Sequence, residues 1–478
     1  MALNDIKFTK TNGGMGRTAA NEDPVSGLIM GLEGIDVSKL TGFDKVVLKA
    51  KTDTTDEIAL YTTKLRFFEQ LAGLGITEQI LETSVNLGNN HSYTSDKLLE
   101  IEKELAGQYK HAVACNTIVY HVKEFFRMNN AGTLYFTIKT GNDVESSDIE
   151  KLQDYSGGII RQVAVFTKEL EVDTINLIDK YQEVCANTID GGLEAKHKPL
   201  SVVVGYCGIS YDVNTEEIID NNEVVTGYEI KLTKTKIESE TEDSKNATLA
   251  KFTKANDYIL KDRCNVSLVI SCDLDTNIIA KLGPYAYYSC IGTTLGAISK
   301  ASVHECIAWV QKFPLSLSVP GFISGDVLRN VSNSDLELIN DQRYIFVRTH
   351  VGDANNYFND SYTLDVETSD YAYIENVRTM DKACRGIRTN LLPYLNSPLH
   401  VNATTGKMQN YVIENLKTVA GKTLELMEQA GELSGYIVDI DPDQNVVSNS
   451  TVEFVIKKVG VGVMRHVRIQ IGYTTQIS

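Results

Sequence analysis

The sequence predicts a multi-domain α/β protein that ends in a C-terminal α+β domain. From residue 158 onward, short apolar strands alternate with helical stretches, a pattern typical of a sheet covered by helices on both faces. The last third instead has two long amphipathic helices followed by strand-like sequence that continues almost to the final residue. With 478 residues, the chain is long enough for about two to four domains.

The first 34 residues differ from the rest and predict an N-terminal linking arm. They contain one short strand-like piece, Ile6 to Thr9, then a glycine-rich loop and the apolar patch Leu28 to Met30. We expect domains to begin at residue 35.

The region 35–340 is expected to be α/β. The expected helices span 58–72, 94–106, 111–128, 173–189 and 294–311, and the expected strands span 132–139, 159–167, 200–207 and 265–272. Residues 211–254 interrupt this order, because they are charged, threonine-rich and proline-free, with one alternating piece from Tyr228 to Thr233. We interpret them as a surface excursion or a mobile loop.

Residues 341–478 form the last block, which begins with a strand at 343–351. Helices are expected at 371–391 and 408–430, each with one apolar stripe, and Gly431 is suited to cap the second. From Val461 to Tyr473 apolar side chains occupy the odd positions with one exception, Arg465, which predicts a strand with one buried face. An unpaired edge of this length invites aggregation unless something covers it.

Composition excludes several classes of protein. A net charge of -17 argues against a general binder of nucleic-acid phosphates. The eight cysteines include no CxxC pair, which favours reduced thiols in a cytoplasmic protein. The first thirty residues lack an apolar core segment, and no run of about 18 apolar residues occurs, so we expect no signal peptide and no membrane span.

The motifs that could carry chemistry all fail on spacing. The glycine cluster "NGGMGR" (12–17) is no phosphate loop, and "DIDPDQNVVSNS" (439–450) lacks the glycine and the glutamate of a calcium loop. His111 and His121 lie about 15 Å apart along one helix, and "VHECIAW" around His304 lacks a second histidine. We therefore expect no enzyme activity, no cofactor and no metal site.

Several stretches of the chain resemble one protein family. They are "GRTAANEDPVSGLIM" (16–30), "VYHVKEFFRMNNAGTLYFTI" (119–138), "SCIGTTLGAISKASVHECIAWVQKFPL" (289–315) and the block from Arg343 to Tyr473. They are similar to contractile tail sheath proteins, most of all to the branch found in phages of the Bacteroidetes and related bacteria. The similarity is a diffuse pattern over most of the chain, and it leaves 211–254 unmatched.

The resemblance implies that the sheet of the C-terminal domain is completed by strands exchanged between subunits. The candidate donated strand is 463–475, with Val463, Val467, Ile469, Ile471 and Tyr473, and the candidate N-terminal strand has Ile6 and Phe8. The alternative is a hairpin folded back within its own domain. We expect a combination, in which 451–459 pairs within its own domain and 463–475 pairs with a neighbouring subunit.

The resemblance also implies the partners. They are further copies of the chain in stacked six-fold rings, an inner tail tube protein, and baseplate and tail terminator proteins. It implies no direct contact with nucleic acid and no membrane insertion, in a contractile tail of a virion assembled in the host cytoplasm. Two alternatives stay open: the sheath of a bacterial contractile injection particle, and a cytoplasmic α/β enzyme.

A basic ridge lies on the helix 371–391. Arg378, Lys382 and Arg385 fall within about 60° of one another and about 150° from the apolar stripe. One interpretation is a solvated face on which Glu375 pairs with Arg378. The other, drawn from the sheath resemblance, is that the ridge faces an acidic inner tube.

Overall fold

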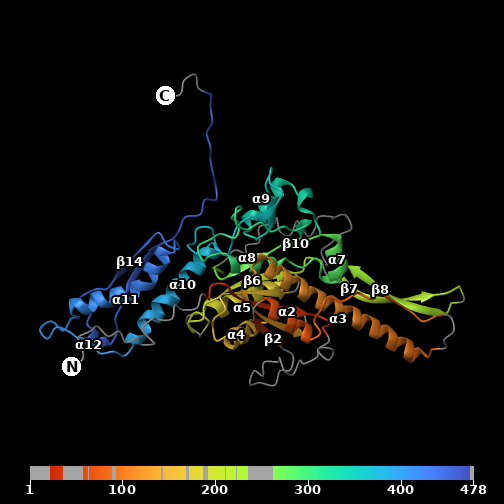
Figure 1. Cartoon of the computed structure of the whole chain (residues 1–478), viewed down its shortest axis with the longest axis horizontal. Coiled ribbons are helices and arrows are strands. Elements are labelled where there is room, and N and C mark those ends of the chain that lie inside the picture. The colour runs from red at the N-terminus through yellow and green to blue at the C-terminus, as the bar shows by residue number, and fades with distance from the viewer. Residues whose placement is uncertain are drawn as a thin grey trace, which may run out of the picture.

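The computed structural model describes residues 22–35, 58–62, 64–88, 93–140, 144–167, 172–186, 192–209, 211–221, 223–234 and 262–473. A central body carries two extensions on opposite sides (Figure 1). One extension contains helices α10 (Ile374–Leu391) and α11 (Asn410–Gln429) with strand β14 (Gly435–Asp439). The other contains the first half of α3 (Ser95–Met128) with strands β7 (Tyr211–Ile219) and β8 (Val225–Lys234). The C-terminal segment leaves the molecule separately.

The body is built on a six-stranded sheet of order β2-β4-β1-β5-β6-β9. Its strands are β1 (Val25–Leu32), β2 (Ile58–Thr62), β4 (Thr133–Thr140), β5 (Gln162–Thr167), β6 (Ser201–Tyr206) and β9 (Val266–Val269). Neighbours are parallel throughout, except that β2 is antiparallel to β4. The expected α/β class is therefore confirmed for the body.

Strand β1 corrects the expected N-terminal arm. It lies between β4 and β5, and all eight of its residues are buried. Leu28 and Met30 point to one core of the body, while Val25 and Ile29 point to the other. An arm that reaches residue 34 does not fit a strand in the middle of the sheet. Residues 1–21, which include Ile6 and Phe8, lie outside the described residues.

Helices pack against both faces of the sheet. One core packs the sheet against α2 (Lys64–Gly73), α3 (Ser95–Met128) and α8 (Ile291–Lys300), and the other packs it against α4 (Ser146–Tyr155) and α5 (Val172–Ala186). Helices α3 and α8 approach closely because α8 carries Gly292 and Gly296 one turn apart. A Cβ at Gly292 would lie 2.2 Å from the His121 carbonyl oxygen.

Several expected elements differ in the structure. Residues 58–62 form a strand ahead of α2, and the two expected helices 94–106 and 111–128 are one continuous helix, α3. Helix α8 ends at Lys300, and 301–312 are mostly turns. The body is completed by α7 (Thr276–Leu282), α9 (Asn333–Asp341) and the paired strands β10 (Ser271–Asp273) with β11 (Pro320–Phe322) and β12 (Val347–Thr349) with β13 (Asn356–Phe358).

The expected insertion 211–254 begins as folded structure. Strands β7 (Tyr211–Ile219) and β8 (Val225–Lys234) form a hairpin that β3 (Ser84–Asn86) extends to three strands. Tyr228 is buried there against Leu105 of α3. The alternating piece 228–233 is therefore a strand, and the remainder, 235–254, lies outside the described residues.

The C-terminal unit begins later than the expected residue 341. Tyr344, Phe346 and Leu364 belong to a core of the body, and Ile345 bridges to Val269 of the central sheet. The separate unit starts with α10 (Ile374–Leu391) and continues with α11 (Asn410–Gln429), β14 (Gly435–Asp439), α12 (Val446–Asn449) and β15 (Val455–Val459). Its α+β composition agrees with the expectation.

Candidate functional site

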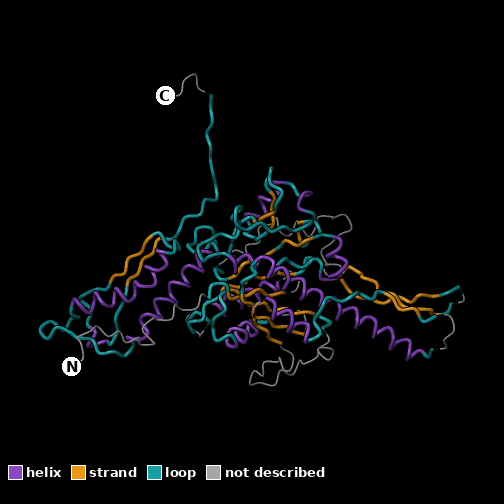
Figure 2. Tube along the Cα trace, in the orientation of Figure 1, coloured by secondary structure: helices purple, strands orange, loops and turns teal. Residues whose placement is uncertain are grey.

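The C-terminal segment, residues 460–473, runs out from the body as an extended chain (Figures 1 and 2). Within the described residues it joins no sheet. Its large apolar side chains are mostly exposed: Met464 81%, Val467 63%, Ile469 80%, Ile471 91% and Tyr473 110%. A contiguous apolar surface of this kind marks a site of protein interaction.

Part of the predicted terminal strand pairs within its own subunit. Strand β15 pairs with β14 in antiparallel register, with Gly435 opposite Val459 and Asp439 opposite Val455. This agrees with the expectation for residues 451–459. In the described part of the chain the sheet has these two strands alone, so each has one edge without a neighbouring strand.

The hairpin presents an apolar outer face. Tyr436 and Ile456 pack inward against the cluster formed by α10 and α11. Ile437, Val455 and Val459 on the other face are 65%, 57% and 63% exposed. The C-terminal unit therefore has both an extended apolar segment and a small sheet with open edges.

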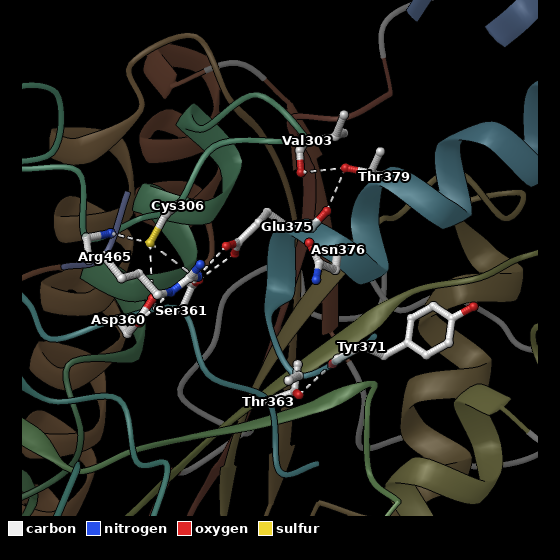
Figure 3. A network of polar contacts seen from close by, with 12 residues as sticks. Val303, Cys306, Asp360, Ser361, Thr363, Tyr371, Glu375, Asn376, Thr379 and Arg465 are labelled. Atoms are coloured by element: carbon white, nitrogen blue, oxygen red, sulfur yellow. Dashed lines mark hydrogen bonds and ion pairs between the residues drawn. The ribbon is translucent and has the colours of Figure 1, made fainter. Parts of the chain in front are cut away.

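One residue ties the C-terminal segment to the body (Figure 3). Arg465 Nε donates to Asp360 Oδ2 at 2.8 Å, and Arg465 Nη2 donates to Glu375 Oε1 at 2.6 Å. The guanidinium carbon lies 3.5 Å from the ring centroid of Tyr373. We call Asp360, Ser361, Tyr373 and Glu375 the Arg465 pocket.

Local structure holds the two carboxylates in place. Ser361 follows β13, and its backbone N–H donates to Asp360 Oδ1 at 2.8 Å while its hydroxyl donates to Glu375. The Cys306 thiol donates to the same Asp360 oxygen at 3.3 Å. Glu375 lies in the first turn of α10, where the helix dipole favours a negative charge. Each of the two carboxylates therefore accepts at least one hydrogen bond from a residue other than Arg465.

The charges of the pocket depend on one another. Glu375 is 3% exposed, and this burial raises its pKa, although Arg465 acts in the opposite direction. Burial works against the charged form of Arg465, but its hydrogen bond and charge interaction with Asp360, together with Glu375, raise its pKa above the ordinary value. Arg465 therefore stays charged and compensates a buried carboxylate.

The ring of Tyr373 is itself fixed from the body. It lies 5.8 Å from the ring of Tyr362, and the two residues form an isolated antiparallel bridge. The guanidinium carbon of Arg343 lies 4.5 Å from the Tyr362 ring and 5.1 Å from the Tyr373 ring. Tyr373 thus presents a positioned aromatic face to Arg465.

The expected basic ridge is not a free surface. Arg378 is 4% exposed and donates to the carbonyl oxygens of Ala301 and Ser302 at 3.1 and 3.4 Å. Lys382 forms ion pairs with Asp23 at 2.7 Å and Glu432 at 2.6 Å. These residues do share one face of α10, but that face packs against the body. Arg378, Lys382 and Arg385 are therefore held by partners within the chain, and their contact with an inner tube stays a prediction.

The expected pair of Glu375 with Arg378 is also replaced, because Glu375 binds Arg465. Arg385 Nη2 lies 3.4 Å from Asp23 Oδ1, so the third residue of the ridge shares the same acid as Lys382. Helix α10 is buried on two faces, one basic and one apolar. The sequence pattern marked only the apolar stripe as buried, so the burial of the basic face could not be predicted from it.

His121, Glu305 and Asp443 belong to the motifs tested in the sequence, and the structure shows the surroundings of each. His121 is 1% exposed, and burial lowers its pKa to about 3. Glu305 accepts from the Ser302 backbone N–H at 2.9 Å and pairs with Lys312 at 2.5 Å. Asp443 of the loop 439–450 pairs with Lys407 at 2.6 Å. The glycine cluster 12–17 lies outside the described residues.

The described residues contain neither a candidate metal site nor a candidate membrane span. They contain no group of three or more His, Cys, Asp or Glu side chains placed to hold a metal ion. No helix among them combines the length and apolarity that crossing a membrane requires.

Sequence reasoning missed the Arg465 pocket. Asp360 and Glu375 lie 105 and 90 residues away from Arg465 in the chain, so no local spacing connects them. One signal was present, since Arg465 is the polar exception in an otherwise apolar row.

Comparison with known families places this pocket at a domain junction. Residues 176–362 match the family model described as DUF2586, N-terminal domain, and residues 370–478 match the model described as DUF2586, C-terminal domain. The two matches follow one another along the chain, with residues 363–369 between them. Asp360 and Ser361 belong to the N-terminal DUF2586 match, while Tyr373, Glu375 and Arg465 belong to the C-terminal one.

The chain is also similar to chains of solved structures. A chain of the "anti-feeding prophage (AFP) baseplate, 6-fold symmetrised" matches with a TM-score of 0.51 at 11% identity, covering 99% of this chain and 100% of the other. A chain of "an Extracellular Contractile Injection System, PVC sheath complex in contracted state" matches with a TM-score of 0.49 at 10% identity, covering 99% and 98%. No curated protein matches the sequence. The first likeness shows a shared fold across essentially the whole chain.

Proposed function

We propose that this protein is a structural subunit of a contractile tail or injection assembly, and specifically a sheath subunit that polymerises by donating its C-terminal segment. The observation that carries the proposal is the extended apolar segment 460–473 beside a two-stranded sheet with open edges. Each copy then has both halves of a contact between copies, a strand to give and an edge to receive it.

The fold likeness supports the class of assembly. The similar chain belongs to a structure described as a baseplate of an anti-feeding prophage, and the likeness extends over both chains. The resemblance of 16–30, 119–138, 289–315 and 343–473 to tail sheath proteins supports the finer assignment. Partners on this proposal are further copies of the chain, an inner tube, and baseplate and terminator proteins of one particle.

The energetics favour pairing over exposure. Burial of an aliphatic or aromatic side chain contributes roughly 1.5–3 kcal/mol. Val467, Ile469, Ile471 and Tyr473 share one side of an extended strand, so together they supply about 6 kcal/mol or more, in addition to new backbone hydrogen bonds. This free energy of burial offsets part of the entropic cost of association. Every donated segment along the assembly contributes the same amount.

The proposed mechanics are those of a bistable packing. Donated strands link neighbouring copies while the bodies change their packing, so a change in one ring passes to the next. Contacts between unlike surfaces, repeated with a rotation that does not close, generate helical stacks. The energy for contraction resides in the interfaces between copies, and the chain performs no catalytic step in this mechanism.

A baseplate ring subunit is the second candidate, since the similar chain of TM-score 0.51 comes from a six-fold baseplate structure. The same donated segment would then close a ring instead of extending a stack. The two candidates use the same contact between copies and differ in its geometry.

Negative-stain electron microscopy of the purified full chain tests the proposal. Long hollow cylinders support the sheath, and closed rings alone support the baseplate candidate. Dispersed monomers at every concentration and salt condition would contradict both and favour the enzyme alternative. A chain that ends at His466 should stay monomeric and folded, because it keeps Arg465 in its pocket and loses the apolar row.

A further inference from the structure

The C-terminal segment is attached to the body at one point. Of residues 461–473, Arg465 alone has a hydrogen bond or ion pair with the rest of the described structure. Gly460 and Gly462 precede it with open space around them. The residues on either side of Arg465 therefore do not fix the direction of the segment. The contacts of Arg465 with its pocket fix that direction.

The pocket has the chemistry of a guanidinium site. Two carboxylates on different elements meet two different nitrogens of one planar group, Nε and Nη2, and an aromatic ring lies against the guanidinium. An ammonium group is a single point charge and cannot reproduce this arrangement of two donors and a stacking plane.

The pocket is held together by the body and not by its ligand. Ser361 binds both acids, Cys306 binds Asp360, and Arg343 lies against the ring of Tyr373. A pocket that contains Glu375 at 3% exposure is destabilised without a cation, because a buried carboxylate is costly when it is uncompensated. The pocket is therefore ordered by its neighbours, and binding of a cation stabilises it.

We propose that the Arg465 pocket is a guanidinium-binding site that fixes the point at which the C-terminal segment leaves the body. Its ligand is Arg465, supplied by the same chain in the structure described above. Arg465 of a second copy has the same chemistry. The inference rests on the proposed function only for the fate of residues 467–473 beyond the pocket.

Trypsin cleavage of the dispersed full chain tests this site. Trypsin must take the arginine side chain into its own specificity pocket, so it cannot cut after Arg465 while the Arg465 pocket holds that side chain. Arg468 lies three residues further along the same segment and is exposed, which makes it an internal control. We expect cleavage after Arg468 to be at least about tenfold faster than after Arg465, followed by mass spectrometry of the C-terminal peptides.

Variants of the pocket give the decisive comparison. Glu375→Gln and Asp360→Asn should bring the two cleavage rates to within about threefold, as should Arg465→Lys, which keeps a tryptic site but loses the guanidinium. Glu367→Gln, an exposed acid on the connection between the pocket residues, should leave the wild-type ratio unchanged. A thermal melt of each variant shows whether the body remains folded.

Dilution identifies the source of the guanidinium. Protection of Arg465 that is independent of protein concentration assigns the site to its own chain, and protection lost on dilution assigns it to a second copy. Equal cleavage after Arg465 and Arg468 in the wild type, or a ratio unchanged in folded Glu375→Gln and Asp360→Asn, would overturn the proposal. Because the measurement uses dispersed subunits, its result is independent of whether cylinders form.

Discussion

Lys382 Nζ lies 2.7 Å from Asp23 Oδ2, an ion pair that joins helix α10 to the residue two positions ahead of the central strand β1. Arg378 and Arg385 approach the same aspartate, one at its carbonyl and one at its carboxylate. The basic face of α10 is therefore a seam between the body and the C-terminal unit.

The seam should contribute strongly to stability. Arg378→Met keeps the apolar stem but leaves the Ala301 and Ser302 carbonyls without their donor and the nearby acids without a buried positive charge. We expect a loss of about 3 kcal/mol in the free energy of unfolding, measured by urea denaturation. Arg388→Met, at an exposed site on the same helix, should change it by less than about 0.5 kcal/mol. Similar values for both variants would refute the seam.

The crossing of α10 and α11 depends on Gly386. A Cβ at this position would lie 2.1 Å from Thr423 Cγ2, closer than side-chain atoms can approach. Gly386→Ala should therefore lower the melting temperature, and Thr423→Ala in the same chain should restore part of the loss. Gly107→Ala in α3, where a Cβ has open space, should instead stabilise the protein by about 0.5–1 kcal/mol. Two stabilised alanine variants would contradict the close crossing.

Asp381 should give the protein a pH dependence. Burial raises its pKa from 3.8 to about 7, against the lowering effect of Arg385. The folded state then binds a proton between about pH 4 and 7 that the unfolded state has released, so stability falls as pH rises through this range. The slope is at most about 1.4 kcal/mol per pH unit. Asp381→Asn should flatten the curve from pH 5 to 7, and an unchanged slope would show that another group controls it.

The elements of the body differ in how far the sequence predicts them. Strands β5 and β6 are short apolar runs between helices and were expected close to their observed positions. Strand β1 was missed because a fully buried strand has no alternation, and its partners β4 and β5 lie more than 100 residues further along the chain. Gly27 also weakened the strand pattern, because glycine is uncommon inside strands. In the structure this position requires glycine, since a Cβ there would lie 2.9 Å from Leu152 Cδ2.

The candidate site was predictable only in part. The apolar row of the C-terminal segment follows from period-two alternation, and its exposure in the isolated chain agrees with a strand that lacks a partner. Helical geometry correctly placed Arg378 and Lys382 on one face of α10. It could not tell that this face is buried, because Asp23 and Glu432, which pair with Lys382, come from distant parts of the chain.

Charges on the C-terminal segment should stop assembly without affecting the fold. Ile469 and Ile471 are 80% and 91% exposed, so Ile469→Asp with Ile471→Asp removes no contact within the described subunit. We expect an unchanged melting temperature and no polymer in sedimentation, since two carboxylates on the buried side of a donated strand are costly. Val351→Asp, at a fully exposed site on the body, should leave both properties unchanged. Normal polymers from the double variant would exclude pairing through this face.

Hydrogen exchange in assembled and dispersed protein tests strand donation most directly. In the dispersed subunit the amides of residues 467–473 have no hydrogen-bond partner within the described structure, so they should exchange at the rate of an unstructured peptide. In the assembly we predict strong protection of these amides, together with new protection at an edge of the β14–β15 hairpin. Assembled particles in which residues 467–473 still exchange freely would contradict the account.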